Sequence, residues 1–122
     1  LEGLSILMQV VDQLRRSGVN PSLGFLGVLM TMFDARTNLA EQVVHDVRNY
    51  LGECVFSVTI PRSVRISEAP SFGAPVTTYA PGSPGARAYV DLAREVLERK
   101  ARGYHFEVAW EEPMAAAAAA PQ

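Results

Sequence analysis

Two arginines stand where they could bind phosphate groups. Arg36 lies in the segment DARTN at positions 34–38, and Arg65 lies in the segment IPRSVR at positions 60–65. Each segment follows an apolar run, and small or polar neighbours leave the planar guanidinium free to donate hydrogen bonds to phosphate oxygens. The alternative is a solvated arginine or, for Arg36, a local ion pair with Asp34.

Residues at the ends of the same two apolar runs could form the walls of a pocket for a nucleotide base. Such a pocket offers an adenine flat apolar contact and backbone hydrogen bonds, and the candidates are Thr31, Met32 and Pro61. Core packing is the alternative for Met32. Pro61 also ends strand pairing and stiffens the loop, whatever else it does. Arg62 is either a phosphate ligand or a structural neighbour of this proline.

Residues for other common chemistries are not spaced to act together. His45 falls within a predicted helix and His105 near the end of the chain, and neither has a second ligand at metal-binding spacing. Cys54 is the single cysteine and starts an apolar run, which predicts a buried structural thiol. The serines lack the glycine elbow of hydrolases. We therefore predict neither a metal site nor a catalytic residue.

The elements that must position the two loops are predicted to be parallel strands. Residues 23–33 and 54–60 are almost continuously apolar, which is typical of strands that helices cover on both faces. Between them Asn38 and Glu41 predict a capped helix that runs to Gly52. Strand, helix and strand make one crossover unit, so both loops should emerge at the carboxyl edge of the sheet, where α/β proteins bind ligands.

A first helix is expected before these strands. It is indicated by apolar residues three and four positions apart, which should form one broad buried face: Leu4, Leu7, Met8, Val11 and Leu14, widened by Ile6 and Val10. The positive charges of Arg15 and Arg16, followed by Gly18, predict the carboxyl end of this helix. Because Leu1 already lies within the apolar pattern, we expect the helix to begin upstream and the sequence to be the back portion of a larger protein.

A loop-rich stretch and a last helix follow the second strand. Residues 61–82 are rich in proline, serine and glycine, with a short strand candidate at 75–79. Ser83 and Pro84 predict the start of a helix with positive charges at its carboxyl end, and its expected buried face is formed by Ala86, Tyr89, Val90, Ala93, Val96 and Leu97. Residues 103–122 are expected to form a mobile alanine-rich tail with Phe106 or Trp110 docked on the surface.

Composition limits the possible partners. The chain has 122 residues, which allows one domain at most, here residues 1–102 followed by the tail. Residues 1–102 hold all 11 basic and 10 of the 13 acidic residues, so no broad positive field is available and nucleic acid would have to be bound by a few placed arginines. No apolar run approaches the length of a membrane helix and no secretory signal is seen, which favours a cytoplasmic protein.

Three sequence segments together resemble the carboxyl-terminal part of the ParA/Soj chromosome- and plasmid-partitioning ATPases. They are EGLS at 2–5, GVLMTMFDARTN at 27–38, and the stretch from IPR at 60–62 to PSFG at 70–73. Residues of the last helix resemble the family as well: Ala86, Tyr89, Leu92, Ala93, Glu95 and Val96. The resemblance covers roughly residues 1–100 in unbroken order and implies an α/β fold, the carboxyl-terminal part of a parallel P-loop NTPase sheet flanked by helices.

The resemblance also implies a function. Members are deviant-Walker ATPases that dimerise around ATP and Mg2+, bind DNA without sequence preference on the nucleoid, and are stimulated by a ParB/Spo0J-like partner. Arg36 and Arg65 match positions that contact DNA, and Thr31, Met32, Pro61 and Arg62 match the region around the adenine. The family's phosphate loop and magnesium-binding aspartate would lie upstream of Leu1. The chain alone is therefore expected to bind no cofactor and to hydrolyse no ATP.

Two rival interpretations stay open at this stage. A MinD-like protein acts at the membrane through a basic amphipathic helix at its carboxyl end, whereas residues 103–122 are acidic and alanine-rich. A non-catalytic binding module that only docks on partners is the second rival. The sequence upstream of Leu1 would separate it from an ATPase, because a module would have no lysine-bearing phosphate loop.

Overall fold

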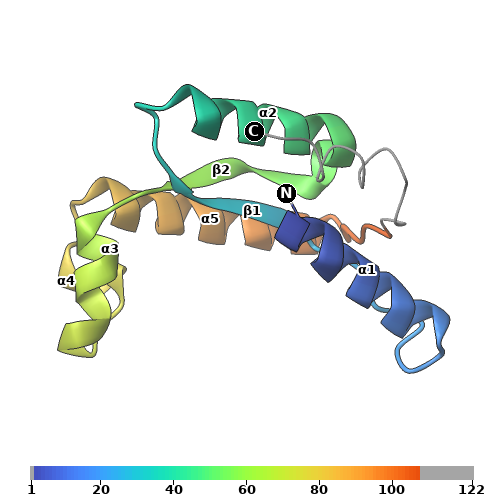
Figure 1. Ribbon diagram of the computed structural model, residues 1–122. Coiled ribbons are helices and arrows are strands. Elements are labelled where there is room, and N and C mark those ends of the chain that lie inside the picture. The colour runs from blue at the N-terminus through green and yellow to red at the C-terminus, as the bar shows by residue number, and fades with distance from the viewer. Residues whose placement is uncertain (1, 108–122) are drawn as a thin grey trace.

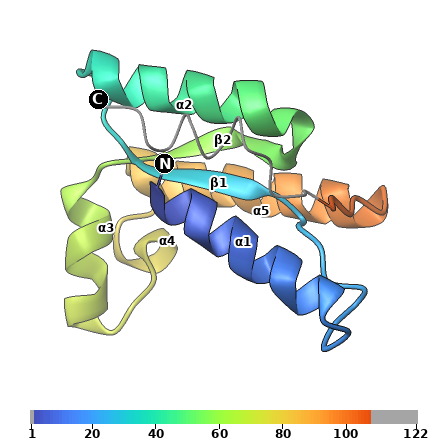
Figure 2. The same ribbon diagram turned by 45° about the vertical axis from the view of Figure 1, so that its right-hand side comes forward.

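Figure 1 shows the computed structural model, which describes residues 2–107. The two strands lie between helices, with α2 on one side of the sheet and α5 on the other in both ribbon views (Figures 1 and 2). In chain order the described elements are α1 (Glu2–Arg16), β1 (Val28–Phe33), α2 (Asn38–Leu51), η1 (Gly52–Cys54), β2 (Val55–Pro61), α3 (Val64–Glu68), η2 (Ala69–Phe72), α4 (Val76–Tyr79) and α5 (Pro84–Ala101).

The strands β1 and β2 pair in parallel, with α2 as the connection between them. Val28 pairs with Val55 and Phe33 with Pro61, and the register shifts twice between these pairs. This arrangement confirms the predicted α/β class, a parallel sheet packed against helices. It also brings the carboxyl ends of both strands to one edge.

The predicted first strand is shorter and less buried than its composition suggests. Pairing starts at Val28, while Phe25 forms a separate antiparallel bridge with Phe106. The side chains of Thr31 and Met32 are exposed. Within residues 2–107 only β2 pairs with β1, so apolar composition overestimates how much of this strand is covered.

The larger core lies on the α2 side of the sheet. Its buried members are Met8, Val47, Leu51, Cys54 and Val55. Burial raises the pKa of the Cys54 thiol, which agrees with the structural role predicted for it. Phe106 packs against this core, and residues 108–122 of the predicted tail, including Trp110, fall outside the described residues.

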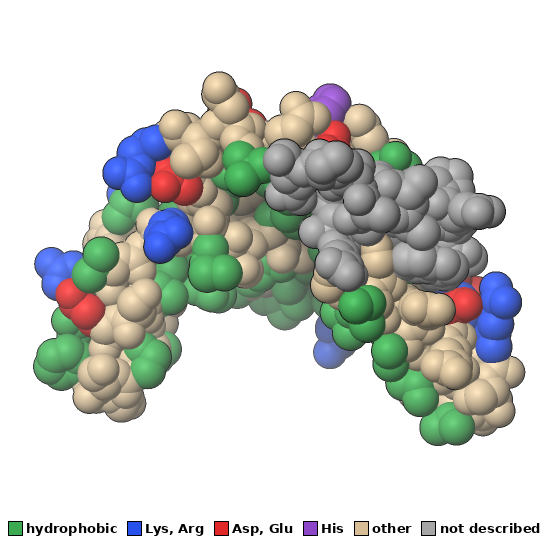
Figure 3. Space-filling view, viewed as in Figure 1, with side chains coloured by type: hydrophobic (Ala, Val, Ile, Leu, Met, Phe, Trp, Pro, Cys, Tyr) green, Lys and Arg blue, Asp and Glu red, His purple; other side chains and the backbone are tan. Residues whose placement is uncertain are grey.

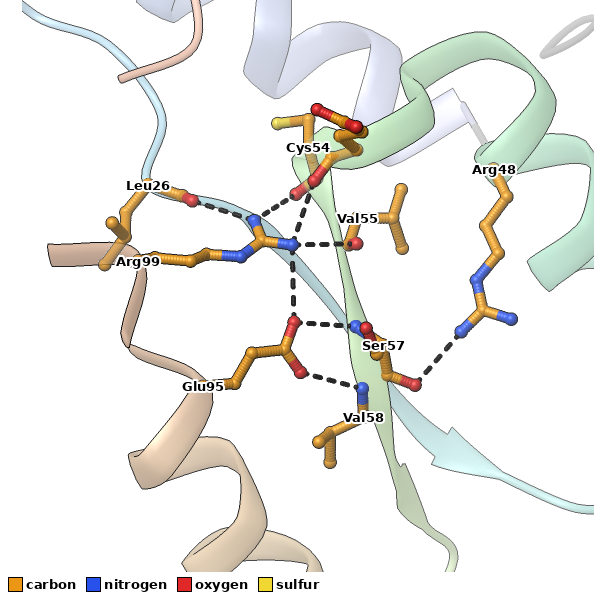
Figure 4. Close-up of polar contacts among 9 residues, drawn as sticks. Leu26, Arg48, Cys54, Val55, Ser57, Val58, Glu95 and Arg99 are labelled. Carbon is orange, nitrogen blue, oxygen red and sulfur yellow. Dashed lines mark hydrogen bonds and ion pairs between the residues drawn. The ribbon is translucent and has the colours of Figure 1, made fainter. Parts of the chain in front are cut away.

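Two charged residues of α5 fasten that helix to β2 (Figure 4). The carboxylate of Glu95 accepts hydrogen bonds from the consecutive backbone amides of Ser57 at 2.8 Å and Val58 at 3.1 Å. The side chain of Arg99 is buried, stacks over the Phe56 ring at 4.2 Å and donates hydrogen bonds to four backbone carbonyls, those of Leu26, Glu53, Cys54 and Val55. The sequence indicated only that a positive charge is favourable at this end of the helix. In the structure Arg99 is a buried residue that attaches α5 to β2.

A smaller cluster holds the segment between β2 and α5. Ala69, Val76 and Ala86 are buried together. Through this cluster α3, η2 and α4 pack against the start of α5. Residues 75–79 were predicted as a short strand, and this prediction is wrong, because Pro75 caps a single helical turn. The turn forms because it buries Val76, which outweighs the strand preference of its β-branched residues.

The predicted buried faces of α1 and α5 are only partly covered. Met8 and Ala86 are buried, but Leu7 and Leu14 of α1 and Val90 and Leu97 of α5 are exposed. Figure 2 shows α1 leaving the sheet towards its carboxyl end, which agrees with the exposure of Leu14. Apolar side chains consequently gather along the underside of the arched surface in Figure 3. No described helix is both long and apolar enough to cross a bilayer.

Candidate functional site

The loops that follow β1 and β2 enclose a cavity of about 610 Å³. The backbone amide of Arg62 donates a 2.9 Å hydrogen bond to the carbonyl of Phe33, which joins the two loops directly after the strands end. The walls come from both loops and from the start of α3: Phe33, Asp34, Ala35, Arg36, Pro61, Arg62, Ser63, Val64 and Ser67. Parallel pairing has therefore brought residues more than 25 positions apart in the sequence to one site.

Arg36 forms the local ion pair that the sequence left open as an alternative. Its Nε and Nη2 atoms each donate a 2.9 Å hydrogen bond to a different carboxylate oxygen of Asp34, and its backbone amide donates a third at 3.1 Å. The hydrogen bond from the Arg36 side chain is the main cause that lowers the pKa of Asp34 from 3.8 to about 2. The Arg36 side chain is still 87% exposed, so the donors that do not bind Asp34 face solvent.

Arg62 also lines this cavity, and its guanidinium has no ion-pair partner among the described residues. Within residues 2–107 no hydrogen bond or ion pair engages its guanidinium, while its positive charge contributes to lowering the pKa of Asp34. Its neighbour Pro61 and Phe33 belong to the apolar part of the lining, together with Ala35 and Val64. A cation beside a flat apolar wall suits a ligand that carries both an anionic group and an aromatic ring.

Arg65 lies on α3, outside the residues that line the cavity. The helix begins where the Ser63 hydroxyl accepts a hydrogen bond from the Ile66 amide. The Nη1 atom of Arg65 lies 3.5 Å from a carboxylate oxygen of Glu68, which also accepts a 2.7 Å hydrogen bond from the Tyr79 hydroxyl. Figure 3 shows basic side chains at this end of the molecule, over α3 and near the start of α2.

Thr31 and Met32 lie at the end of β1 but do not line the cavity. Met32 has a φ of 51°, a left-handed backbone conformation that is costly for a side chain of this size, and its side chain is 75% exposed. It falls in the second stretch where the strand register shifts. Strained residues cluster at functional sites, so this backbone conformation makes the end of β1 a candidate functional position.

Comparison with known proteins identifies the chain's relatives. No protein-family profile matches the chain. The ParA chromosome partitioning protein of Caulobacter vibrioides is 50% identical over 100 residues, which is 82% of this chain. The chain is a homologue of the ParA/Soj chromosome-partitioning ATPases. The chromosome-partitioning ATPase Soj of Thermus thermophilus is 50% identical over 99 residues, and the sporulation initiation inhibitor protein Soj of Bacillus subtilis is 51% identical over 96.

The ParA/Soj homology concerns one part of the longer proteins. The chain spans 37% of the length of the Caulobacter relative, 39% of the Thermus protein and 38% of the Bacillus protein. Within residues 2–107 of this ParA/Soj homologue, no group of three or more histidine, cysteine, aspartate or glutamate side chains is placed to hold a metal ion.

The structure of this ParA/Soj homologue divides the predicted site residues into groups. Arg36, Pro61 and Arg62 share the cavity, whereas Thr31, Met32 and Arg65 lie outside its lining. Sequence reasoning missed the contact network around Arg65. The three-residue spacing from Arg65 to Glu68 within one helix was the available signal for the first contact, and no local pattern pointed to Tyr79.

Proposed function

We propose that the chain is the carboxyl-terminal part of a ParA/Soj-like ATPase that binds ATP and non-specific DNA to partition chromosomes or plasmids. The observation that carries the proposal is the pair of loops at the carboxyl edge of the sheet, which supplies both an arginine-lined cavity and exposed arginines. The homology to partitioning proteins supports the same assignment.

The cavity is the proposed adenine side of the nucleotide site. Pro61 and Phe33 offer apolar contact there, and the free guanidinium of Arg62 offers hydrogen bonds. Thr31 and Met32 remain proposed contributors from the end of β1. The printed sequence has no glycine-rich, lysine-bearing phosphate loop, and its described residues offer no cluster of magnesium ligands. We therefore propose that the rest of the parent protein binds the phosphates and Mg2+, and we expect no ATP hydrolysis by this chain alone.

Arg36 and Arg65 are the proposed DNA contacts. Each guanidinium pairs with a nearby carboxylate, Arg36 with Asp34 and Arg65 with Glu68, while most of its side chain stays open to solvent. Two such arginines in each subunit of an ATP-dependent dimer would contact several phosphates, and binding through phosphates alone would not depend on base sequence. A ParB/Spo0J-like partner and a cytoplasmic, nucleoid-associated location complete the proposal.

The test uses the complete protein that carries this sequence. The double variant R36A/R65A should bind a labelled random-sequence duplex much more weakly than the parent in the presence of ATP, measured by fluorescence anisotropy, while it keeps its affinity for a fluorescent ATP analogue. The matched control is R94A/R102A, which removes an exposed arginine of α5 and the exposed arginine that directly follows this helix; both also pair with acids, Asp91 and Glu98. DNA affinity of R36A/R65A equal to that of the parent at low salt would refute the proposed contacts.

A further inference from the structure

The carboxylate of Glu68 is shared between an arginine and a tyrosine. Its Oε2 atom accepts a 2.7 Å hydrogen bond from the Tyr79 hydroxyl and lies 3.5 Å from Nη1 of Arg65. The Glu68 side chain is 39% exposed and that of Arg65 60%. The short contact is thus with the tyrosine and the long one with the arginine, so Tyr79 holds this oxygen more firmly than Arg65 does.

The tyrosine is the fixed member of the three. Its ring stacks on Phe72 with the centroids 4.9 Å apart and packs against the small buried cluster of Ala69, Val76 and Ala86. Both ribbon views place α4 beside α3, which carries the other two side chains (Figures 1 and 2). The hydrogen bond to Glu68 is the main cause that raises the pKa of Tyr79, so the hydroxyl stays protonated and keeps donating.

The pair of Asp34 and Arg36 in the first loop has a different geometry. There both carboxylate oxygens bind the guanidinium, through Nε and Nη2, at 2.9 Å each. The oxygen of Glu68 that lies nearest Arg65 is the one that Tyr79 holds, and its distance of 3.5 Å from the guanidinium is longer than either contact of Arg36 with Asp34. The guanidinium of Arg65 therefore keeps more of its donors for another anion.

We propose that Tyr79 is a positioning residue for Arg65, because it restrains the carboxylate of Glu68 so that the arginine stays available to DNA phosphate. This inference rests on the proposed DNA contact of Arg65. Removing the hydroxyl would free Glu68 to capture Arg65, and removing the charge of Glu68 would relieve its repulsion of phosphate. Tyr79 then acts on DNA chiefly through Glu68, although its hydroxyl also interacts with Arg65, an interaction that acts to lower the pKa of Tyr79.

A double-mutant cycle in the complete protein tests this dependence. Anisotropy titrations of a labelled random-sequence duplex would compare Y79F, E68Q and Y79F/E68Q. We expect Y79F to weaken binding by about three- to tenfold, the scale of one net hydrogen bond, and E68Q to tighten it by about threefold. In the E68Q background, Y79F should change affinity by less than about twofold, because sites act independently once their shared contact is removed.

The salt dependence supplies a readout that loss of packing would not change. If Glu68 captures Arg65 in Y79F, the slope of log affinity against log salt should fall by up to about 0.9 per subunit, as for one lost phosphate contact. Matched controls are Y50F, which removes a phenol on α2 that has no described hydrogen bond, and E98Q, which removes an acid paired with Arg102 at 3.0 Å. Both should leave affinity and slope unchanged.

The possible failures are distinguishable. An equal loss from Y79F in both backgrounds, or no loss in either, would overturn the positioning role, because Tyr79 would then act through packing or not at all. If R65A by itself leaves DNA binding and its salt slope unchanged, the proposed contact of Arg65 fails and the positioning role fails with it. If R65A weakens binding but the cycle shows no coupling, only the positioning role is overturned.

Discussion

The carboxylate of Glu95 lies 3.3 Å from the guanidinium of Arg99, one helical turn away on α5. Together the two side chains bind both kinds of backbone group on β2, since Glu95 accepts from amides and Arg99 donates to carbonyls. The strand register between β1 and β2 shifts across this stretch. The pair therefore satisfies backbone groups where the sheet is irregular and fixes the strand that leads into the second loop of the site.

Replacing Arg99 by alanine should strongly destabilise the fold. The side chain is 6% exposed, and its loss leaves the Glu95 carboxylate without its cation and four carbonyls without their donor. We expect the free energy of unfolding to fall by about 3–5 kcal/mol, measured by denaturant titration of the complete protein. The exposed Arg94 provides the control, and R94A should change it by less than about 0.5 kcal/mol. A similarly small effect of R99A would contradict the anchoring role.

Gly27 is required because two buried groups pass close to it. A Cβ atom at this position would lie 2.5 Å from the Phe56 ring and 2.6 Å from Nη1 of Arg99. We expect G27A to reduce the free energy of unfolding by about 1–3 kcal/mol through overpacking. G82A is the matched control, because a Cβ at Gly82 meets nothing within 4 Å. Equal stability of the two variants would show that the Arg99 stack can move aside.

The start of α2 offers a test in which sequence and structure disagree. The pattern predicts Asn38 as the cap, but the hydroxyl of Thr37 is the group that accepts a hydrogen bond from the Ala40 amide, at 3.2 Å. T37A should therefore cost about 1 kcal/mol of unfolding free energy, whereas N38A should cost a few tenths at most. The reverse order in denaturant titrations would restore Asn38 as the cap.

Local sequence patterns predicted the helices and strands that depend only on interactions between residues close in sequence. Ser83 and Pro84 start α5 as expected, because a hydroxyl cap and a proline in the first turn act within one turn of helix. The turn at 75–79 was missed because its helical form depends on burying Val76 against distant Ala86. Arg99 was missed for the same reason, since its carbonyl partners lie more than 40 positions away. In the site, the shared edge was predictable from strand order, but the restraint on Arg65 by Tyr79 depends on tertiary packing.

The ion pair in the first loop should be visible in a pH titration. The pKa of Asp34 is lowered to about 2, so the pair with Arg36 is fully formed above the ordinary value of 3.8 and is lost as the pH falls through about 2. Carbon NMR of the labelled carboxyl group should therefore show Asp34 mostly ionised at pH 3 in the parent and mostly protonated in R36A. A parent midpoint near 3.8, or a midpoint that R36A leaves near 2, would contradict the geometry of this loop.

The salt dependence of DNA binding tests the central assignment most directly. Each phosphate contact contributes about 0.9 to the slope of log affinity against log salt. Relative to the parent, R36A/R65A should lower that slope by about 1.8 per subunit, while the control R94A/R102A keeps the parental value. Parallel salt-dependence lines for the parent and R36A/R65A would show that these two arginines do not contact DNA.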